Sequence, residues 1–119
     1  MGRVDVEAIG PFLRRVLRRF RPAHVILFGS RARGGWTKYS DYDLVIVSEA
    51  FESVRRFDRI LSVRSELRRG EEFDIDVICL TPEEFERARD NPFTGVVYVA
   101  AREGVDLLPR VARRRRAIA

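Results

Sequence analysis

Apolar residues recur along the chain with two different periods, one typical of helices and the other of strands. From Asp5 to Phe20 they follow helical spacing, with arginines on the opposite face. Gly10-Pro11 either breaks this helix or marks its start, because proline is tolerated in a first turn and is costly later. The pattern predicts an amphipathic helix that ends before Pro22. Its polar face, expected to be solvated or to meet an acidic partner, carries Arg14, Arg15, Arg18 and Arg19.

Compact apolar runs rich in branched residues predict strands, because buried strands have side chains of this kind on both faces. The predicted strands cover residues 23–28, 41–47 and 72–80, with a last edge strand at 105–108. The first leads directly into Gly29-Ser30, and residues 34–40 form a loop before the second. Trp36 and Tyr39 lie in this loop, where they either cover the core or flank a nucleobase.

Helical spacing returns between the later strands. Residues 51–69 predict a helix that stops at Gly70, with inward positions Val54, Phe57, Ile60, Leu61 and Leu67. Thr81-Pro82-Glu83-Glu84 predicts a helix start, because it has a threonine cap, a proline in the first turn and a glutamate three residues after the cap. Residues 90–104 favour a further helix, although their valines also allow a strand. Strands thus alternate with helices, which predicts an α/β fold.

Length, charge and cysteine content narrow the class of protein. A chain of 119 residues has room for one domain, predicted at 1–109. Five of the 23 basic residues lie in the predicted tail at 110–119; the other 18 match the 18 acidic residues, so the domain is formally neutral. This tail is expected to be a disordered terminus, or else to contact nucleic acid.

The single cysteine, Cys79, is expected to pack in the core and excludes an internal disulfide. We find no signal peptide and no membrane-spanning run, which indicates a cytoplasmic protein.

Aspartates at alternate positions on strands suggest a metal site. Asp41 and Asp43 stand at the start of the second strand, and a side-chain period of two directs both carboxylates the same way, with Tyr42 on the opposite face. Asp74 and Asp76 compete for a third position on the next strand. Three carboxylates beside a Gly-Ser turn that offers N–H groups to phosphate suit two-metal nucleotidyl transfer, in which two Mg²⁺ ions lie about 3.5–4 Å apart.

These residues form a pattern that resembles the minimal nucleotidyltransferases of the DNA polymerase beta superfamily. The pattern is Gly29-Ser30, ten intervening residues, Asp41-Tyr42-Asp43, and then Asp76 followed by apolar residues. The resemblance implies a small mixed sheet with helices packed on one face. It implies metal binding and catalysis by Asp41, Asp43 and Asp76, with Asp74 as the alternative that fits less well. It also implies nucleotide binding by Gly29, Ser30, Arg31 and Arg33.

The resemblance also suggests what the enzyme acts on. Small members of this family are often encoded beside a HEPN-type helical protein, an RNase toxin that they neutralise by transferring AMP from ATP to it. The short chain ends where larger relatives carry an acceptor-binding domain, so a protein acceptor is expected. The chain would then be a protein adenylyltransferase and an antitoxin. The alternatives are an antitoxin that neutralises its partner by binding alone, and a nucleotidyltransferase acting on RNA or a small hydroxylated molecule. The sequence leaves open whether the chain forms a homo-oligomer.

Overall fold

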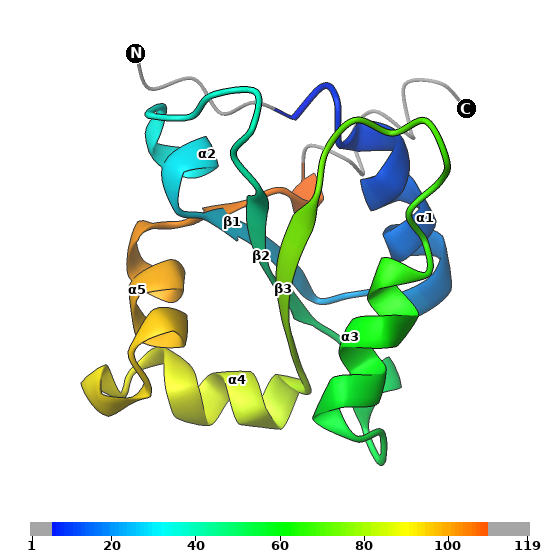
Figure 1. Cartoon of the computed structure of the whole chain (residues 1–119). Coiled ribbons are helices and arrows are strands. Elements are labelled where there is room, and N and C mark those ends of the chain that lie inside the picture. Colours follow the sequence, from blue (N-terminus) through cyan, green and yellow to red (C-terminus); the bar gives the residue numbers. More distant parts are fainter. Residues whose placement is uncertain (1–5, 110–119) are drawn as a thin grey trace.

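The computed structural model describes residues 6–109, and the tail predicted at 110–119 lies outside this range. Within it the chain forms a four-stranded sheet flanked by helices (Figure 1). The strands are β1 (His24–Phe28), β2 (Tyr42–Val47), β3 (Ile75–Leu80) and β4 (Val105–Asp106). The helices are α1 (Gly10–Phe20), α2 (Ser30–Arg33), α3 (Arg56–Arg64), α4 (Pro82–Arg89) and α5 (Val96–Glu103), with short 3-10 helices η1 (Glu49–Phe51) and η2 (Pro92–Thr94).

The sheet is mixed, as expected, with strand order β3-β2-β1-β4. β1 pairs antiparallel with both β2 and β4, whereas β2 and β3 are parallel. Because parallel strands need a crossover, the chain leaves one end of β2, passes through α3 and returns to begin β3 at the other end. The starts of β2 and β3 therefore lie at the same end of the sheet as the end of β1.

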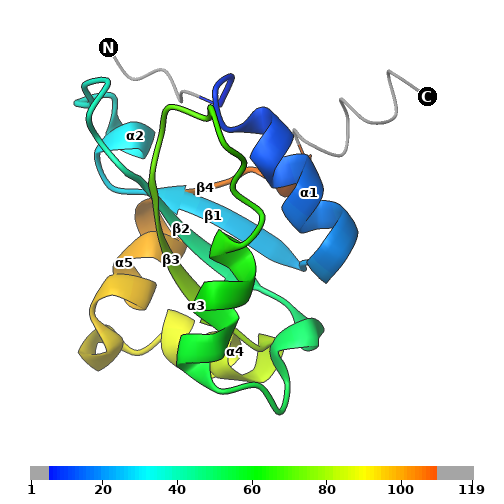
Figure 2. The same cartoon turned by 45° about the vertical axis from the view of Figure 1, so that its right-hand side comes forward.

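Helices pack on both faces of the sheet, so the expectation of helices on one face is wrong. One face carries the larger core, to which α1 contributes Phe12 and Val16 and α3 contributes Val63. The other face carries a smaller core with Phe85 of α4 and Val97 of α5. Figures 1 and 2 show α1 and α3 on one side of the sheet and α4 and α5 on the other. The helical spacing of apolar residues identifies the buried face of a helix, but it does not show on which face of the sheet that helix packs.

α3 is shorter than predicted, and a different set of its side chains is buried. Of the predicted helix over 51–69, only Arg56–Arg64 is α-helical; η1 ends at Phe51, and Ser53 between the two has a positive φ of 63°. Phe57 and Leu61, predicted to point inward, are 68% and 50% exposed. Arg59 is buried in their place, because its guanidinium is held by Glu84 and by backbone carbonyls. Paired charge thus overrides apolar spacing in this helix.

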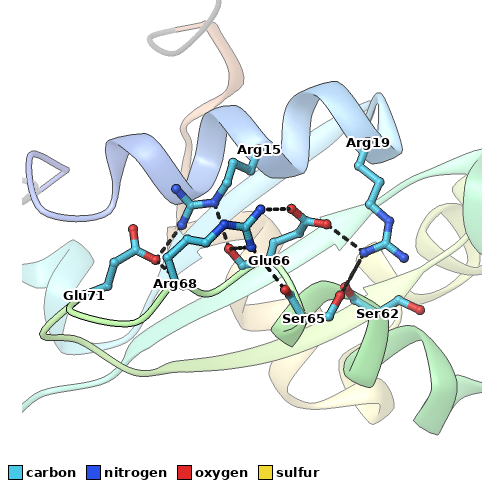
Figure 3. Close-up of polar contacts among 7 residues, drawn as sticks. All are labelled: Arg15, Arg19, Ser62, Ser65, Glu66, Arg68 and Glu71. Carbon is cyan, nitrogen blue, oxygen red and sulfur yellow. Dashed lines mark hydrogen bonds and ion pairs between the residues drawn. The ribbon is translucent and has the colours of Figure 1, made fainter.

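Arginines of α1 hold the long connection between α3 and β3, a role that the sequence did not indicate (Figure 3). Arg15 donates through Nε to the Glu66 carbonyl at 2.8 Å and through Nη2 to the Glu71 carboxylate. Arg19 donates to the Glu66 carboxylate at 2.7 Å and to the Ser65 hydroxyl at 2.8 Å. Part of the helix face expected to be solvated is therefore an internal contact.

The C-terminal half of the domain contains a capped helix, a break between two helical segments and a short edge strand. The capping box predicted at Thr81 and Glu84 is present at the start of α4. The stretch predicted to be helical at 90–104 contains η2 and α5, separated at Gly95, where φ is +61°. β4 is held against β1 partly by His24, whose Nδ1 lies 2.8 Å from a carboxylate oxygen of Asp106. No helix among residues 6–109 has both the length and the apolar character needed to cross a bilayer.

Candidate active site

The register of the sheet aligns two of the predicted carboxylates. Phe28 of β1 is opposite Asp43 of β2, and Asp43 is opposite Asp76 of β3. These three side chains form one row across the face that carries α4 and α5. The next row on this face, Ile26-Val45-Ile78, is apolar, and the row after it joins His24 to the apolar pair Val47 and Leu80. The face thus changes from apolar to acidic at its last row, where β1 ends and β2 and β3 begin.

The predicted phosphate turn lies directly against this acidic row. Gly29 follows β1 with φ 72° and ψ −157°, a conformation that favours glycine. A Cβ atom at Gly29 would also overlap the Oδ2 atom of Asp43. Ser30 begins α2, and the N–H groups of Ala32 and Arg33 donate to the Gly29 carbonyl at 3.1 Å each. The glycine therefore allows the turn and the Asp43 carboxylate to come close together.

The electrostatics of Asp43 show that three aspartates share this region. Burial raises the pKa of the Asp43 carboxyl, and the negative charges of Asp76 and Asp41 raise it further, while Arg33 acts in the opposite direction. Asp41 is exposed just before β2, and Asp76 is exposed on β3. Like charges held together in this way are typical of functional sites.

Asp74 lies outside this arrangement. Its carboxylate forms an ion pair with Arg64 at 3.0 Å and accepts the backbone N–H of Ile75 at 2.8 Å. Its carbonyl accepts the N–H of Tyr42 at 3.0 Å, which begins the contact between the segments that lead into β2 and β3. Of the two candidates for the third position, Asp76 is the one that faces Asp43 across the strands.

The donor atoms at the acidic row suit a divalent cation. Carboxylate oxygens are hard ligands of the kind that Mg²⁺ prefers, and Mg²⁺ takes its other ligands from water and substrate phosphates. A bound cation would also relieve the repulsion that raises the pKa of Asp43. Among residues 6–109, no three side chains of the metal-binding types are already gathered around one point. The fit to Mg²⁺ therefore rests on the chemistry of the carboxylates and on the proximity of Asp41, Asp43 and Asp76.

The two predicted nucleotide-binding arginines occupy different places. Arg33 is exposed and close enough to Asp43 to affect its pKa. Arg31 is buried, with 4% exposure, between the rings of Trp36 and Tyr42, and it donates to the Ser40 carbonyl. The structure therefore places Arg33 beside the carboxylates, and Arg31 under the loop that leads to them.

Two aromatic positions in this region were left partly open by the sequence. Trp36 lies over the Arg31 guanidinium, whereas Tyr39 is 83% exposed with Lys38 near its ring. Phe28 lies in the row with Asp43 because of the antiparallel register between β1 and β2, which period two along β1 does not provide. No sequence pattern predicts the stacking of Trp36 on Arg31, because this contact depends on the folding of the loop.

The acidic row next to a glycine turn at one end of a mixed sheet suits a class of protein that handles nucleotide phosphates with a divalent metal. Comparison with known proteins agrees: the family model of the nucleotidyltransferase domain matches residues 11–71, just over half of the chain. The chain belongs to this nucleotidyltransferase domain family. The match contains Gly29, Ser30, Asp41 and Asp43, whereas Asp76 lies beyond its end.

A solved structure supports the same family. The chain resembles the crystal structure of a presumed nucleotidyltransferase from Sulfolobus solfataricus, with a TM-score of 0.58 and 25% sequence identity. The alignment covers 86% of this chain and 78% of the other. Among curated proteins, the comparison finds no match. The fold and the general reaction, nucleotidyl transfer, are thus established by family, and the acceptor is a separate question.

Proposed function

We propose that the chain transfers AMP from ATP to a hydroxyl group of a partner protein in a Mg²⁺-dependent reaction. We further propose that the partner is a HEPN-type helical toxin, which the transfer neutralises, so that the chain acts as an antitoxin in the cytoplasm. Membership of the nucleotidyltransferase family supports the reaction type. The nature of the acceptor rests on the resemblance of the Gly29-Ser30 and Asp41-Tyr42-Asp43 motifs to minimal nucleotidyltransferases.

One observation carries the catalytic part of the proposal. Asp43 faces Asp76 across paired strands and lies against Gly29 of the phosphate turn. A nucleotide whose phosphates met the backbone at Gly29 and Ser30 would therefore have its α-phosphate region beside these carboxylates. Burial raises the pKa of Asp43, and the neighbouring acids raise it further; this second contribution supports binding of a cation there.

The reaction forms a bond between the acceptor oxygen and the α-phosphorus and breaks the bond from that phosphorus to the oxygen that bridges to the β-phosphate. Pyrophosphate leaves with the electron pair of the broken bond. Asp41, Asp43 and Asp76 would hold the ions, and Asp76 would accept the proton of the attacking hydroxyl. When bound, Mg²⁺ neutralises charge on the attacking and leaving oxygens. Gly29 lets the backbone approach the phosphates without a side chain in the way.

The test is a transfer assay with ATP labelled at the α-phosphate, Mg²⁺ and the protein encoded by the adjacent gene. We expect label to move to that protein, with a mass increase equal to one AMP. Transfer should stop with EDTA, and in the Asp41→Asn, Asp43→Asn double variant. Failure of wild-type protein to label any acceptor would count against the enzymatic proposal.

The matched control is Asp74→Asn, which makes the same chemical change two residues from Asp76 but outside the acidic row. We expect this variant to keep most of the transfer activity, whereas Asp76→Asn should lose it. The opposite result would assign the third ligand to Asp74. If the double variant protects cells from the partner as well as wild type does, neutralisation is by binding alone; label appearing on RNA instead of protein would identify a nucleic acid acceptor.

A further inference from the structure

The candidate active site is assembled from two segments that must keep a fixed spacing. The phosphate turn at Gly29-Ser30 follows β1, and the paired aspartates begin β2, with residues 34–40 between them. The sheet holds β1 and β2 together, but Asp41 lies one residue outside β2. Something besides the strand ladder must therefore place Asp41.

Arg31 contacts the chain on both sides of Asp41. Its Nε and Nη2 atoms donate to the Ser40 carbonyl at 3.1 and 2.9 Å. Its guanidinium carbon lies 4.4 Å from the ring centroid of Tyr42. Ser40 and Tyr42 are the two neighbours of Asp41 in sequence, so one side chain from α2 holds the residue before and the residue after this aspartate.

The loop and the core also enclose Arg31. Trp36 covers it, with 4.7 Å between the guanidinium carbon and the ring centroid. Tyr42 is fully buried in the core face that carries α1, opposite to the face of Asp43. Arg31 therefore contacts Tyr42 on the face of the sheet opposite to the acidic row. Its guanidinium is buried and stacked, whereas Arg33 is exposed.

We propose that Arg31 is a positioning residue that fixes Asp41, and through Tyr42 also Asp43, relative to the phosphate turn. This inference rests on the proposed nucleotidyl transfer and replaces the expectation that Arg31 meets phosphate. The planar guanidinium can stack on two rings and donate twice to one carbonyl, which an ammonium group cannot do. Such spacing matters because a displacement of about 1 Å can reduce a reaction rate about 100-fold.

The closing experiment uses Trp36 as a reporter, because it is the single tryptophan of the chain. Arg31→Met removes the guanidinium and keeps the apolar stem. Lys38→Met is the matched control, since Lys38 lies 5.1 Å from the Tyr39 ring in the same loop but is exposed. We expect acrylamide to quench Trp36 fluorescence more strongly in Arg31→Met and equally in Lys38→Met and wild type. Circular dichroism checks that each variant is folded.

Binding and kinetics then separate positioning from general damage. The affinity for Mn²⁺ in the presence of α,β-methylene ATP, followed by EPR, should fall about tenfold or more in Arg31→Met and stay within about twofold in Lys38→Met. In the transfer assay, kcat should fall about 100-fold, with a smaller change in KM for ATP. Arg31→Lys should restore little, whereas it would restore much of a direct phosphate contact.

A second variant keeps the inference testable if Arg31→Met does not fold. Trp36→Leu removes the outer ring of the stack at a partly exposed position, and we expect a loss of Mn²⁺ affinity in the same direction. Normal Mn²⁺ affinity and kcat in both variants, or full recovery by Arg31→Lys, would overturn the positioning role. If wild-type protein binds neither Mn²⁺ nor the nucleotide analogue, the proposed function itself fails, and the two failures are thereby distinct.

Discussion

Carboxylates in this protein are placed in two opposite ways. In the scaffold, Glu66, Glu71 and Glu84 each lie within ion-pair distance of arginine. At the candidate active site, Asp41, Asp43 and Asp76 lie near one another, and their mutual repulsion contributes to the raised pKa of Asp43. The scaffold acids are paired with arginine inside the fold, whereas the acids of the acidic row repel one another. We expect this difference to separate structural charge from functional charge.

The scaffold pattern is clearest at Glu84. Burial opposes ionisation of its carboxyl, but hydrogen bonds from the Arg59 side chain and from the backbone N–H of Thr81, together with nearby positive charge, outweigh burial and lower the pKa to about 2. Arg59 also donates to the carbonyls of Val54 and Cys79, so it joins the segment before α3 to β3 and α4. The pair thus has a structural explanation without any ligand, which the acidic row does not.

The largest expected effect comes from Asp43→Asn, which removes a repelled charge from the acidic row. Transfer activity should fall by at least about 10³-fold, which corresponds to about 4 kcal/mol of barrier. The folded state should at the same time gain about 1 kcal/mol, seen as a rise of about 4 °C in Tm without metal, because like-charge repulsion is relieved. Added Mg²⁺ should then raise the Tm of wild type and not that of the variant.

This prediction fails if Asp43→Asn is active, or if it is markedly less stable than wild type. The first result would remove Asp43 from the site, and the second would give it a structural role like that of Glu84. Differential scanning calorimetry with and without Mg²⁺, beside the transfer assay, distinguishes these outcomes.

The grouping of Asp41 and Asp43 beside Gly29 could be predicted from the sequence, because it follows from local periods and from short spacing along the chain. Alternation along a strand is enough to direct Asp41 and Asp43 to one face. Strand period alone could not separate Asp76 from Asp74, and the preference for Asp76 came from the family resemblance. The parallel register of β2 and β3 then places Asp76, and not Asp74, opposite Asp43. The surroundings of these residues are therefore less predictable than the residues themselves.

Several residues whose surroundings the sequence did not indicate are arginines. Arg15 and Arg19 were expected on a solvated face, Arg59 has a buried position that apolar spacing does not predict, and Arg31, expected to meet phosphate, is 4% exposed between two rings. In each case the guanidinium contacts a carbonyl, a carboxylate or an aromatic ring. That partner is distant in sequence or is brought close by a folded loop. A long cationic side chain can stack, donate and remain buried, so its location depends on partners that periodicity does not reveal.

A smaller but still large effect is expected where a scaffold pair is broken. Arg59→Met should lower the free energy of unfolding by about 3 kcal/mol, because it leaves the Glu84 carboxylate partly buried without its main partner. Urea unfolding measured by circular dichroism gives this value. The double variant Arg59→Met, Glu84→Gln should recover part of the loss. A loss of less than about 1 kcal/mol in the single variant would contradict a structural role for the pair.

Acid should remove the same contribution without any substitution at Arg59. The pKa of Glu84 is about 2 in the folded chain, below the ordinary value of 4.5, so the folded state favours the ionised form. Its contribution is complete above about pH 4.5 and is lost as the pH falls towards 2. The difference in unfolding free energy between wild type and Glu84→Gln should therefore shrink by about 2 kcal/mol from pH 7 to pH 3. A constant difference over this range would disprove the assignment.

The smallest effect is expected at an ion pair that has the same residue types as the scaffold pairs but is exposed to solvent. Glu83 and Arg87 lie four residues apart on α4 with 2.9 Å between Oε1 and Nη1, but their side chains are 79% and 67% exposed. Water screens such a pair and its long side chains lose freedom when they meet, so Arg87→Ala should cost about 0.3–0.5 kcal/mol, and less at high salt. Urea unfolding at low and high salt measures both quantities. A loss as large as that of Arg59→Met would show that the ion pair itself, and not its burial, makes the scaffold carboxylates structural.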